Sequence, residues 1–252
     1  RAMQLKLLDA DGRKIPGKVS EDCLFMNIYT PKNISKLVPV LVWMHGGAFK
    51  NGSANEFDGS VLAEQQQVVV VTLNFRLGAF GFVDFSRFGA EYAGSASNGV
   101  RDAILALQWI QDNIEEYSGD PSNVTISGES SGGTMVLSLL GCPSADSLYQ
   151  KAIACSPTCA YRDLEDPTSK IRLALNINTD DYLSPMLKMS SLDICNIELG
   201  FGPHVDGEVI KESTFQAIKS RGVNGVPLLI GSNSREGTLY TEGKDQDQPH
   251  YE

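Results

Sequence analysis

The sequence has few histidines and no excess of basic residues. It contains three histidines, and its 21 lysines and arginines are outnumbered by 31 aspartates and glutamates, so the formal net charge is −10. A chain this acidic repels phosphate backbones and anionic membrane surfaces, so we expect no nucleic-acid partner. No apolar run approaches the roughly 20 residues that a membrane span requires, and none is expected. A mechanism that needs an imidazole base must draw on His45, His204 or His250.

Cysteine is also sparse. The five cysteines are an odd number and form no Cys-x-x-Cys pair, so we expect neither a zinc site nor a dense disulfide framework. Cys155 and Cys159 are close enough in sequence to form a bridge, although buried free thiols are the simpler interpretation. The chain begins at Arg1 rather than at a methionine, from which we expect a processed or truncated chain. Cellular compartment and oligomeric state stay open.

Apolar runs alternate with helical patterns along the chain. At 252 residues the chain is long enough for one sizeable α/β domain. Runs that are apolar on both faces suit strands of a parallel sheet covered by helices. We therefore expect a doubly wound, mostly parallel central sheet with helices on both faces, and a helical excursion from the sheet over 159–202. The predicted strands are 38–44, 68–73, 124–127, 151–154 and 226–230, and the predicted helices are 61–66, 98–117 and 134–140.

The segment 128–133 (GESSGG) carries the strongest chemical signal. It lies between a predicted strand and a predicted helix, which is the context of a G-x-S-x-G nucleophile elbow. Such a turn exposes the central hydroxyl, that of Ser130, at the end of the strand, and glycines on either side avoid collisions with neighbouring backbone. The alternative is a glycine-rich turn whose serine only caps the following helix.

A second motif, 45–49 (HGGAF), follows the predicted strand 38–44. Small residues at a strand end allow consecutive backbone N–H groups to face one point. This is the pattern of the HGG-type half of an oxyanion hole, which the N–H of Ser131, the residue after the nucleophile, would complete. Alone, the pattern is an ordinary glycine turn. The presence of both motifs in this order makes acyl transfer the more specific interpretation.

A serine nucleophile needs a base, and the base needs an acid that orients it. After Ser130, the loop beyond the strand 226–230 supplies Glu236, at the edge where such sheets present catalytic groups. A solvated loop carboxylate is the alternative. Among the histidines, His45 precedes the nucleophile and His204 precedes Glu236. His250 follows Glu236, although only a short stretch of chain separates the two.

These motifs occur together with several others that resemble the type-B carboxylesterase/cholinesterase family. The resemblance is dense from about residue 20 to 157 and patchy from there to 237. It implies an α/β-hydrolase fold and hydrolysis of carboxylic esters, with a small-molecule ester as substrate and no metal or organic cofactor. The segments that carry it, besides the two motifs above, are 20–27 (SEDCLFMN), 43–49 (WMHGGAF), 74–78 (NFRLG), 119–126 (GDPSNVTI), 201–207 (FGPHVDG) and 231–237 (GSNSREG).

The resemblance also implies a role for particular residues. Ser130 would be the nucleophile, Glu236 the triad acid, and His250 the triad histidine, since 250–252 (HYE) is faintly similar to the family's histidine segment. The oxyanion donors would be the N–H groups of Gly47, Ala48 and Ser131, with Gly46 shaping the turn. The acid Glu129 and the pair Arg76 and Asp102 would belong to structural ion pairs rather than to the chemistry.

The chain also departs from the family pattern. We expect residues 1–252 to be a single α/β-hydrolase domain that lacks the family's N-terminal segment and most of its C-terminal part, because the family's histidine lies well beyond the acid. Cys23 then has no evident disulfide partner. A fragment, a compact relative with a relocated histidine and an inactive member all remain open. The alternative function is a catalytically inactive, cholinesterase-like binding or adhesion domain.

Overall fold

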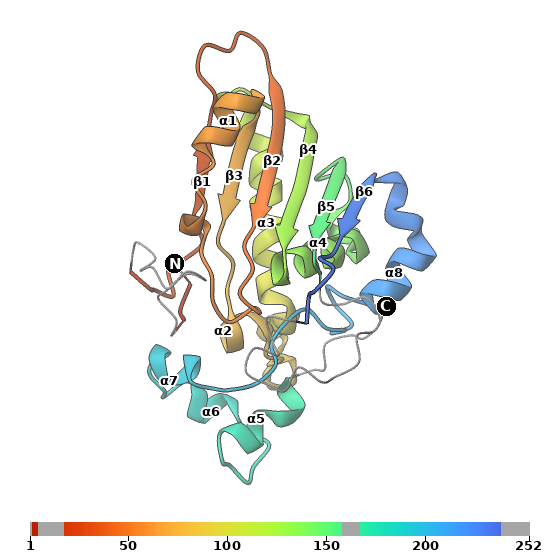
Figure 1. The fold of residues 1–252 in the computed structure, drawn as a ribbon. Coiled ribbons are helices and arrows are strands. Elements are labelled where there is room, and N and C mark those ends of the chain that lie inside the picture. Colours follow the sequence, from red (N-terminus) through yellow and green to blue (C-terminus); the bar gives the residue numbers. More distant parts are fainter. Residues whose placement is uncertain (1, 5–17, 158–166, 238–252) are drawn as a thin grey trace.

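The computed structural model describes residues 2–4, 18–157 and 167–237. Within these residues the strands form one six-stranded sheet in the order β1-β3-β2-β4-β5-β6 (Figure 1). β1 runs antiparallel to β3, and every other neighbouring pair is parallel. The mostly parallel sheet predicted from the sequence is therefore confirmed. The strands are β1 (Met26–Tyr29), β2 (Val38–Met44), β3 (Val69–Leu73), β4 (Gly119–Glu129), β5 (Lys151–Cys155) and β6 (Leu228–Gly231).

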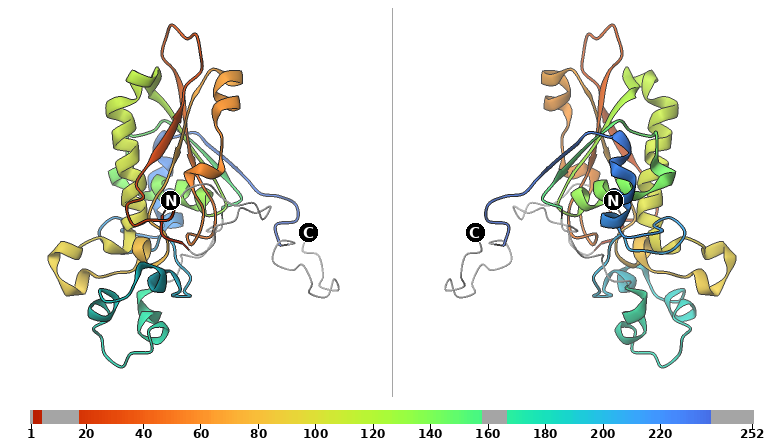
Figure 2. Two further views of the ribbon diagram at one scale, coloured as in Figure 1. Left: turned by 90° about the vertical axis from the view of Figure 1, so that its left-hand side faces the viewer. Right: turned by 90° about the vertical axis from the view of Figure 1, so that its right-hand side faces the viewer.

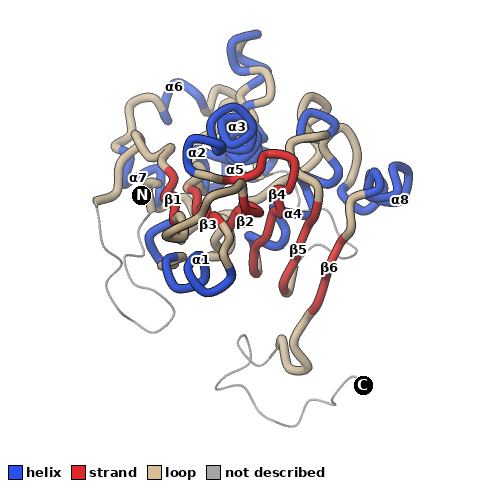
Figure 3. The backbone as a smooth tube through the Cα atoms, turned by 90° about the horizontal axis from the view of Figure 1, so that it is seen from above, coloured by secondary structure: helices blue, strands red, loops and turns tan. Residues whose placement is uncertain are grey.

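Helices cover both faces of the sheet, and further helices lie beyond the carboxyl ends of its parallel strands. α3 and α4 lie against one face, and α1 lies against the other (Figure 3). α5, α6 and α7 lie beyond the carboxyl ends of the parallel strands, so the expected helical excursion is confirmed for its described residues (Figures 1 and 2). The helices are α1 (Ser60–Gln66), α2 (Gly78–Phe82), α3 (Asn98–Asn113), α4 (Ser131–Gly141), α5 (Thr168–Ala174), α6 (Leu183–Met186), α7 (Ser191–Cys195) and α8 (Thr214–Arg221).

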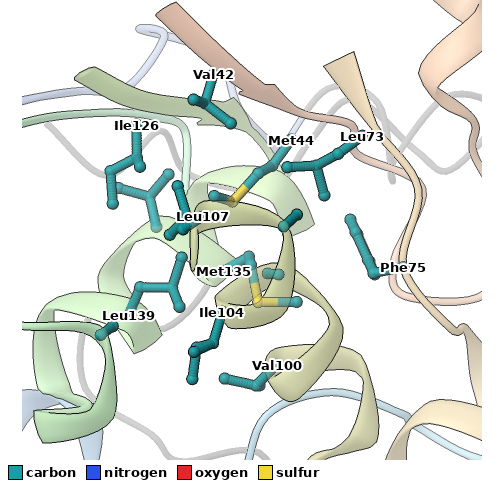
Figure 4. Close-up of a cluster of buried hydrophobic side chains, with 14 of the residues drawn as sticks. Val42, Met44, Leu73, Phe75, Val100, Ile104, Leu107, Ile126, Met135 and Leu139 are labelled. Atoms are coloured by element: carbon teal, nitrogen blue, oxygen red, sulfur yellow. The ribbon is translucent and has the colours of Figure 1, made fainter. Parts of the chain in front are cut away.

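The main core lies between the sheet and the pair α3 and α4. Successive side chains of a strand point to opposite faces, and in β2 every second residue is buried. Leucine, isoleucine and methionine at helical spacing on α3 and α4 meet these strand residues (Figure 4). Burying one such side chain contributes about 1.5–3 kcal/mol, so this layer holds the strand ends in place. Its members include Val42, Met44, Ile126, Val100, Ile104, Leu107, Met135 and Leu139.

Several element boundaries differ from the predictions. The strand predicted at 124–127 begins earlier, at Gly119, because Gly119 pairs with Val38 of β2 across a register shift. The short edge strand β1 and the helices α2 and α8 were not predicted. β1 has only four residues, all of them half-buried, and therefore lacks a clear apolar alternation. Pairing with β3, rather than local pattern, makes this segment a strand.

A buried ion pair connects α3 to the chain that follows β3. Asp102 accepts hydrogen bonds from the backbone N–H, Nε and Nη2 of Arg76, at 2.9, 2.8 and 2.7 Å. The Asp102 side chain is 3% exposed, and a buried carboxylate without an opposite charge would be strongly destabilising. Arg76 supplies that opposite charge. The structural role expected for Arg76 and Asp102 is confirmed.

The thiols are not all buried. Cys23 and Cys142 are buried and free, and burial raises the pKa of Cys23 to about 11. Cys155 is free but exposed, so the interpretation as a buried thiol is wrong for this residue, which is the last residue of β5 and lies at the carboxyl end of the strand. Cys159 lies outside the described residues. No helix in the described part of the chain is long and apolar enough to cross a membrane.

Candidate active site

The carboxyl ends of the parallel strands bring the motif residues to one edge of the sheet. Gly128 of β4 is paired with Met44 of β2 on one side and with Ala154 of β5 on the other, and Ala154 is paired with Ile230 of β6. The residues that follow these strands therefore emerge side by side. They are the segment beginning at His45, the turn at Ser130, Ser156 and the loop that carries Glu236.

The turn at Ser130 is sharply strained. Ser130 has φ 54° and ψ −121°, a conformation that is costly for a residue other than glycine. Its N–H donates to the Cys155 carbonyl at 2.9 Å, and its carbonyl accepts from the Thr134 N–H at 3.0 Å. The Ser130 side chain makes no capping hydrogen bond to α4. The alternative in which this serine only caps the helix therefore finds no support in the structure.

Two glycines allow the turn to pack this closely. A Cβ added to Gly128 would lie 2.4 Å from the carbonyl carbon of Gly132, and a Cβ added to Gly132 would lie 2.1 Å from the Met44 carbonyl oxygen. Both contacts are far below van der Waals distance, and both are to backbone atoms. These glycines therefore let α4 begin directly against the ends of β4 and β2.

The glycine turn after β2 lies beside the serine. A Cβ added to Gly46 would lie 3.3 Å from the Cβ of Ser130. Gly47 and Ala48 follow with φ 108° and 55°. Ser131 is the first residue of α4, so its N–H has no partner inside the helix. The predicted oxyanion residues thus come from two segments that flank Ser130.

Glu236 is held by a small network that includes a residue not predicted from the sequence. Ser156 Oγ donates to Glu236 Oε1 at 2.5 Å, and the Asn233 N–H donates to the same oxygen at 2.6 Å. The hydrogen bond from Ser156 is the main cause that lowers the pKa of the exposed Glu236 carboxyl. Ser156 has φ 47° and directly follows β5. Its position at the same edge of the sheet as Ser130 is the signal that could have identified it from the sequence.

Glu129 directly precedes Ser130, and its pKa depends on its burial and on the charge of Glu236. Partial burial raises the pKa of Glu129, and the negative charge of Glu236 raises it further. Glu129 has no ion-pair partner among the residues described, so the expectation of a structural ion pair is not met for Glu129 there. The two carboxylates therefore share the edge that carries Ser130.

The three histidines have different positions. His45 is 1% exposed, and burial lowers its pKa to about 4, so its imidazole is neutral near pH 7. His204 is buried, with Nδ1 3.0 Å from the Gly202 carbonyl oxygen. His250 lies outside the described residues. Sequence order alone therefore still supports His250 as the candidate base.

One cavity of the described chain lies away from Ser130. A cavity of about 560 Å³ is lined by residues that precede β5 and β6, among them Tyr149, Gln150 and Val226. It therefore opens near the amino ends of these strands, at the opposite end of the strands from Ser130. Among the described residues, no cluster of three or more His, Cys, Asp or Glu side chains could hold a metal ion.

Comparisons with known proteins agree with this geometry. The family model described as "Carboxylesterase family" matches residues 2–251. The chain is 39% identical to the para-nitrobenzyl esterase of Bacillus subtilis over 251 residues, which are 93% of this chain and 51% of that protein. It is 33% identical to the fumonisin B1 esterase of Sphingopyxis macrogoltabida over 92% of this chain and 45% of that protein.

Solved structures show the same similarity. The carboxylesterase EST55 of Geobacillus stearothermophilus superposes with a TM-score of 0.80 at 35% identity, over 90% of this chain and 50% of that chain. A structure titled "PNB esterase" superposes with a TM-score of 0.79 at 36% identity, over 98% of this chain and 54% of that chain. The chain thus spans about half the length of the relatives it matches.

Proposed function

The chain belongs to the carboxylesterase family and has its α/β-hydrolase fold, and we propose that it serves as a serine carboxylesterase that forms an acyl-enzyme on Ser130. The observation that carries this proposal is the strained backbone of Ser130, with φ 54° and ψ −121°, beside the glycine turn at Gly46. Backbone strain of this kind persists only where the surrounding structure enforces it, as at the nucleophile of an elbow. One core that includes residues from Cys23 to Ile210 supports treating 1–252 as a single domain.

In the proposed reaction, Ser130 Oγ attacks the carbonyl carbon of an ester while an imidazole takes its proton. The candidate imidazole is that of His250, and Glu236 would orient it and stabilise its positive charge. The carbonyl oxygen becomes negative in the tetrahedral intermediate. The N–H groups of Gly47, Ala48 and Ser131 would bind that oxygen, and each such donor lowers the barrier by about 3–4 kcal/mol.

The intermediate then collapses and releases the alcohol, which takes its proton from the imidazolium. The acyl group stays on Ser130 as an ester until water, activated by the same imidazole, attacks it. The second tetrahedral intermediate uses the same oxyanion site and releases the carboxylic acid. Acylation returns the imidazole to its neutral form, and in deacylation the imidazolium gives its proton to the departing Ser130 Oγ, so the full cycle restores both groups.

Active-site labelling tests the proposal directly. The full chain should react with a fluorophosphonate probe, and mass spectrometry of the digested protein should place the adduct on Ser130. The same chain should hydrolyse a short-chain p-nitrophenyl ester. Absence of both reactions from a folded sample would overturn the proposal. A folded chain that gives neither an adduct nor turnover but binds a partner protein, with unchanged affinity in Ser130→Ala, would instead support the inactive binding domain.

Substitution of Ser156 tests whether Glu236 is the acid that orients the base. Replacing Ser156 with alanine removes one hydrogen bond to a charged oxygen, and because Glu236 is exposed we expect a loss of about tenfold in kcat/KM. The hydrogen bond lowers the pKa of Glu236, so its removal should shift the acidic limb of the pH–rate profile to higher pH. Steady-state kinetics from pH 4 to 8 would measure both effects.

Ser122→Ala is a matched control for this substitution. The Ser122 hydroxyl donates to the Asp120 carboxylate at 2.6 Å, also on the surface, but on β4 far from its carboxyl end. It should leave kcat/KM and the pH profile unchanged. An unchanged acidic limb in Ser156→Ala would argue against Glu236 as the group that orients the base.

A further inference from the structure

Two peptide groups in the turn after β2 are held by their carbonyl oxygens. The Gly46 carbonyl oxygen lies 2.8 Å from His45 Nδ1, and the Gly47 carbonyl oxygen accepts from the N–H groups of Lys50 and Asn51, both at 3.0 Å. A trans peptide is planar, with its C=O and N–H pointing in opposite directions. Holding the Gly46 oxygen therefore sets the direction of the Gly47 N–H, and holding the Gly47 oxygen sets that of Ala48.

These two N–H groups are not used elsewhere in the described structure. Neither Gly47 nor Ala48 donates a backbone hydrogen bond to another described residue. Glycine at 47, with φ 108°, has little intrinsic preference that would hold its peptides in one orientation. The contacts to the two carbonyl oxygens therefore decide where the donors point.

The His45 ring is itself fixed. It is stacked on Phe75, with ring centroids 4.6 Å apart and planes 6° from parallel. Gly52 packs against the Nδ1 edge of the ring, where an added Cβ would lie 2.1 Å from Nδ1 and 2.4 Å from the Gly46 oxygen. The Gln4 side chain holds the Gly52 backbone through two hydrogen bonds, of 2.8 and 3.0 Å. The ring therefore cannot turn away from the Gly46 carbonyl without moving this packed layer.

The contact also selects one tautomer. A carbonyl oxygen only accepts, so Nδ1 must carry the proton and donate it. Burial lowers the pKa of His45 to about 4, so the ring carries a single proton at neutral pH. Nε2 is then an acceptor, and it is buried with no hydrogen-bond partner among the described residues. A ring protonated on Nε2 would instead direct the Nδ1 lone pair at the Gly46 oxygen, which is repulsive.

We propose that His45 is a positioning residue for ester hydrolysis, in which its Nδ1–H holds the Gly46–Gly47 peptide so that the Gly47 N–H faces the reacting oxygen at Ser130. This inference rests on the proposed function, because the N–H is useful only where an oxyanion forms. His45 does not touch the substrate and exchanges no proton with it. Its contribution is the orientation of one main-chain donor before the reaction begins.

Two substitutions separate the hydrogen bond from ring packing. His45→Phe keeps a flat ring against Phe75 but has no donor, whereas His45→Asn offers an amide N–H near the position of Nδ1. We expect His45→Phe to lower kcat by about 10²–10³-fold, the effect of losing one oxyanion donor, with KM changed by less than about threefold. His45→Asn should recover activity to within about tenfold of the unaltered chain. Thermal unfolding of each variant would show that it is folded.

A measurement independent of catalysis keeps the inference separate from the proposed function. In the full chain labelled with ¹⁵N-histidine, the nitrogen spectrum at pH 7 should show His45 as a neutral ring protonated on Nδ1. If the chain shows no ester turnover, the proposed function fails while this spectrum still tests the hydrogen bond to Gly46.

Three results would overturn the inference. The first is a His45 ring protonated on Nε2. The second is a folded His45→Phe variant with unchanged kcat in an active enzyme. The third is a folded His45→Asn variant as inactive as His45→Phe, because the ring and not the donor would then matter.

Discussion

Replacing Ser130 with alanine should abolish fluorophosphonate labelling and lower ester turnover by about 10⁴–10⁶-fold, the range seen when a nucleophile is removed from a catalytic triad. The hydroxyl at this position is the only group of the protein that becomes covalently bonded to the acyl carbon in the proposed mechanism. The backbone should not change, because alanine and serine meet similar conformational limits at φ 54°. Turnover of a p-nitrophenyl ester, corrected for the uncatalysed rate, measures the effect.

Ser131→Ala is the matched control for this experiment. Ser131 is buried, its hydroxyl has no hydrogen-bond partner among the described residues, and the mechanism uses only its N–H. Activity should therefore stay within a few-fold of the unaltered chain. Turnover that persists in Ser130→Ala but is lost in Ser131→Ala would place the nucleophile at Ser131 and refute the assignment of Ser130.

Gly132→Ala should destabilise the fold by about 3 kcal/mol or more, although alanine is the better helix former by about 1 kcal/mol. The reason is steric. The new Cβ would lie 2.1 Å from the Met44 carbonyl oxygen and 2.8 Å from that of His45. Both atoms are backbone at the end of β2, so α4 must move away from the sheet, and the oxyanion turn must move with it. Urea unfolding, followed by circular dichroism, measures the change in the free energy of unfolding.

Gly200→Ala is the control for the glycine substitution. An added Cβ at Gly200 would meet nothing within 4 Å, and its backbone is not in the left-handed region. The free energy of unfolding should therefore change by less than about 0.5 kcal/mol. A Gly132→Ala variant as stable as this control would show that α4 does not start directly against β2.

The sequence by itself determined the parallel strands and the motifs at their ends. Val38–Met44 and Val69–Leu73 are continuous apolar runs, and such runs form buried parallel strands in many contexts. The glycines around Ser130 likewise predict a tight turn from the sequence alone, because few residues other than glycine tolerate backbone atoms this close. Signals of this kind depend only on neighbouring residues, so they can be recognised without knowledge of the rest of the fold.

Only the tertiary structure decided which groups support these motifs. The hydrogen bond between Ser156 and Glu236 joins residues that lie 80 positions apart, and the β5–β6 pairing brings them together. Likewise, HGG predicts a glycine turn, but the stacking of His45 on Phe75, which fixes the ring beside the Gly46 carbonyl, depends on β2 and β3 being neighbours. Contacts between distant segments follow from strand order and register, and neither is written in the local pattern of residues.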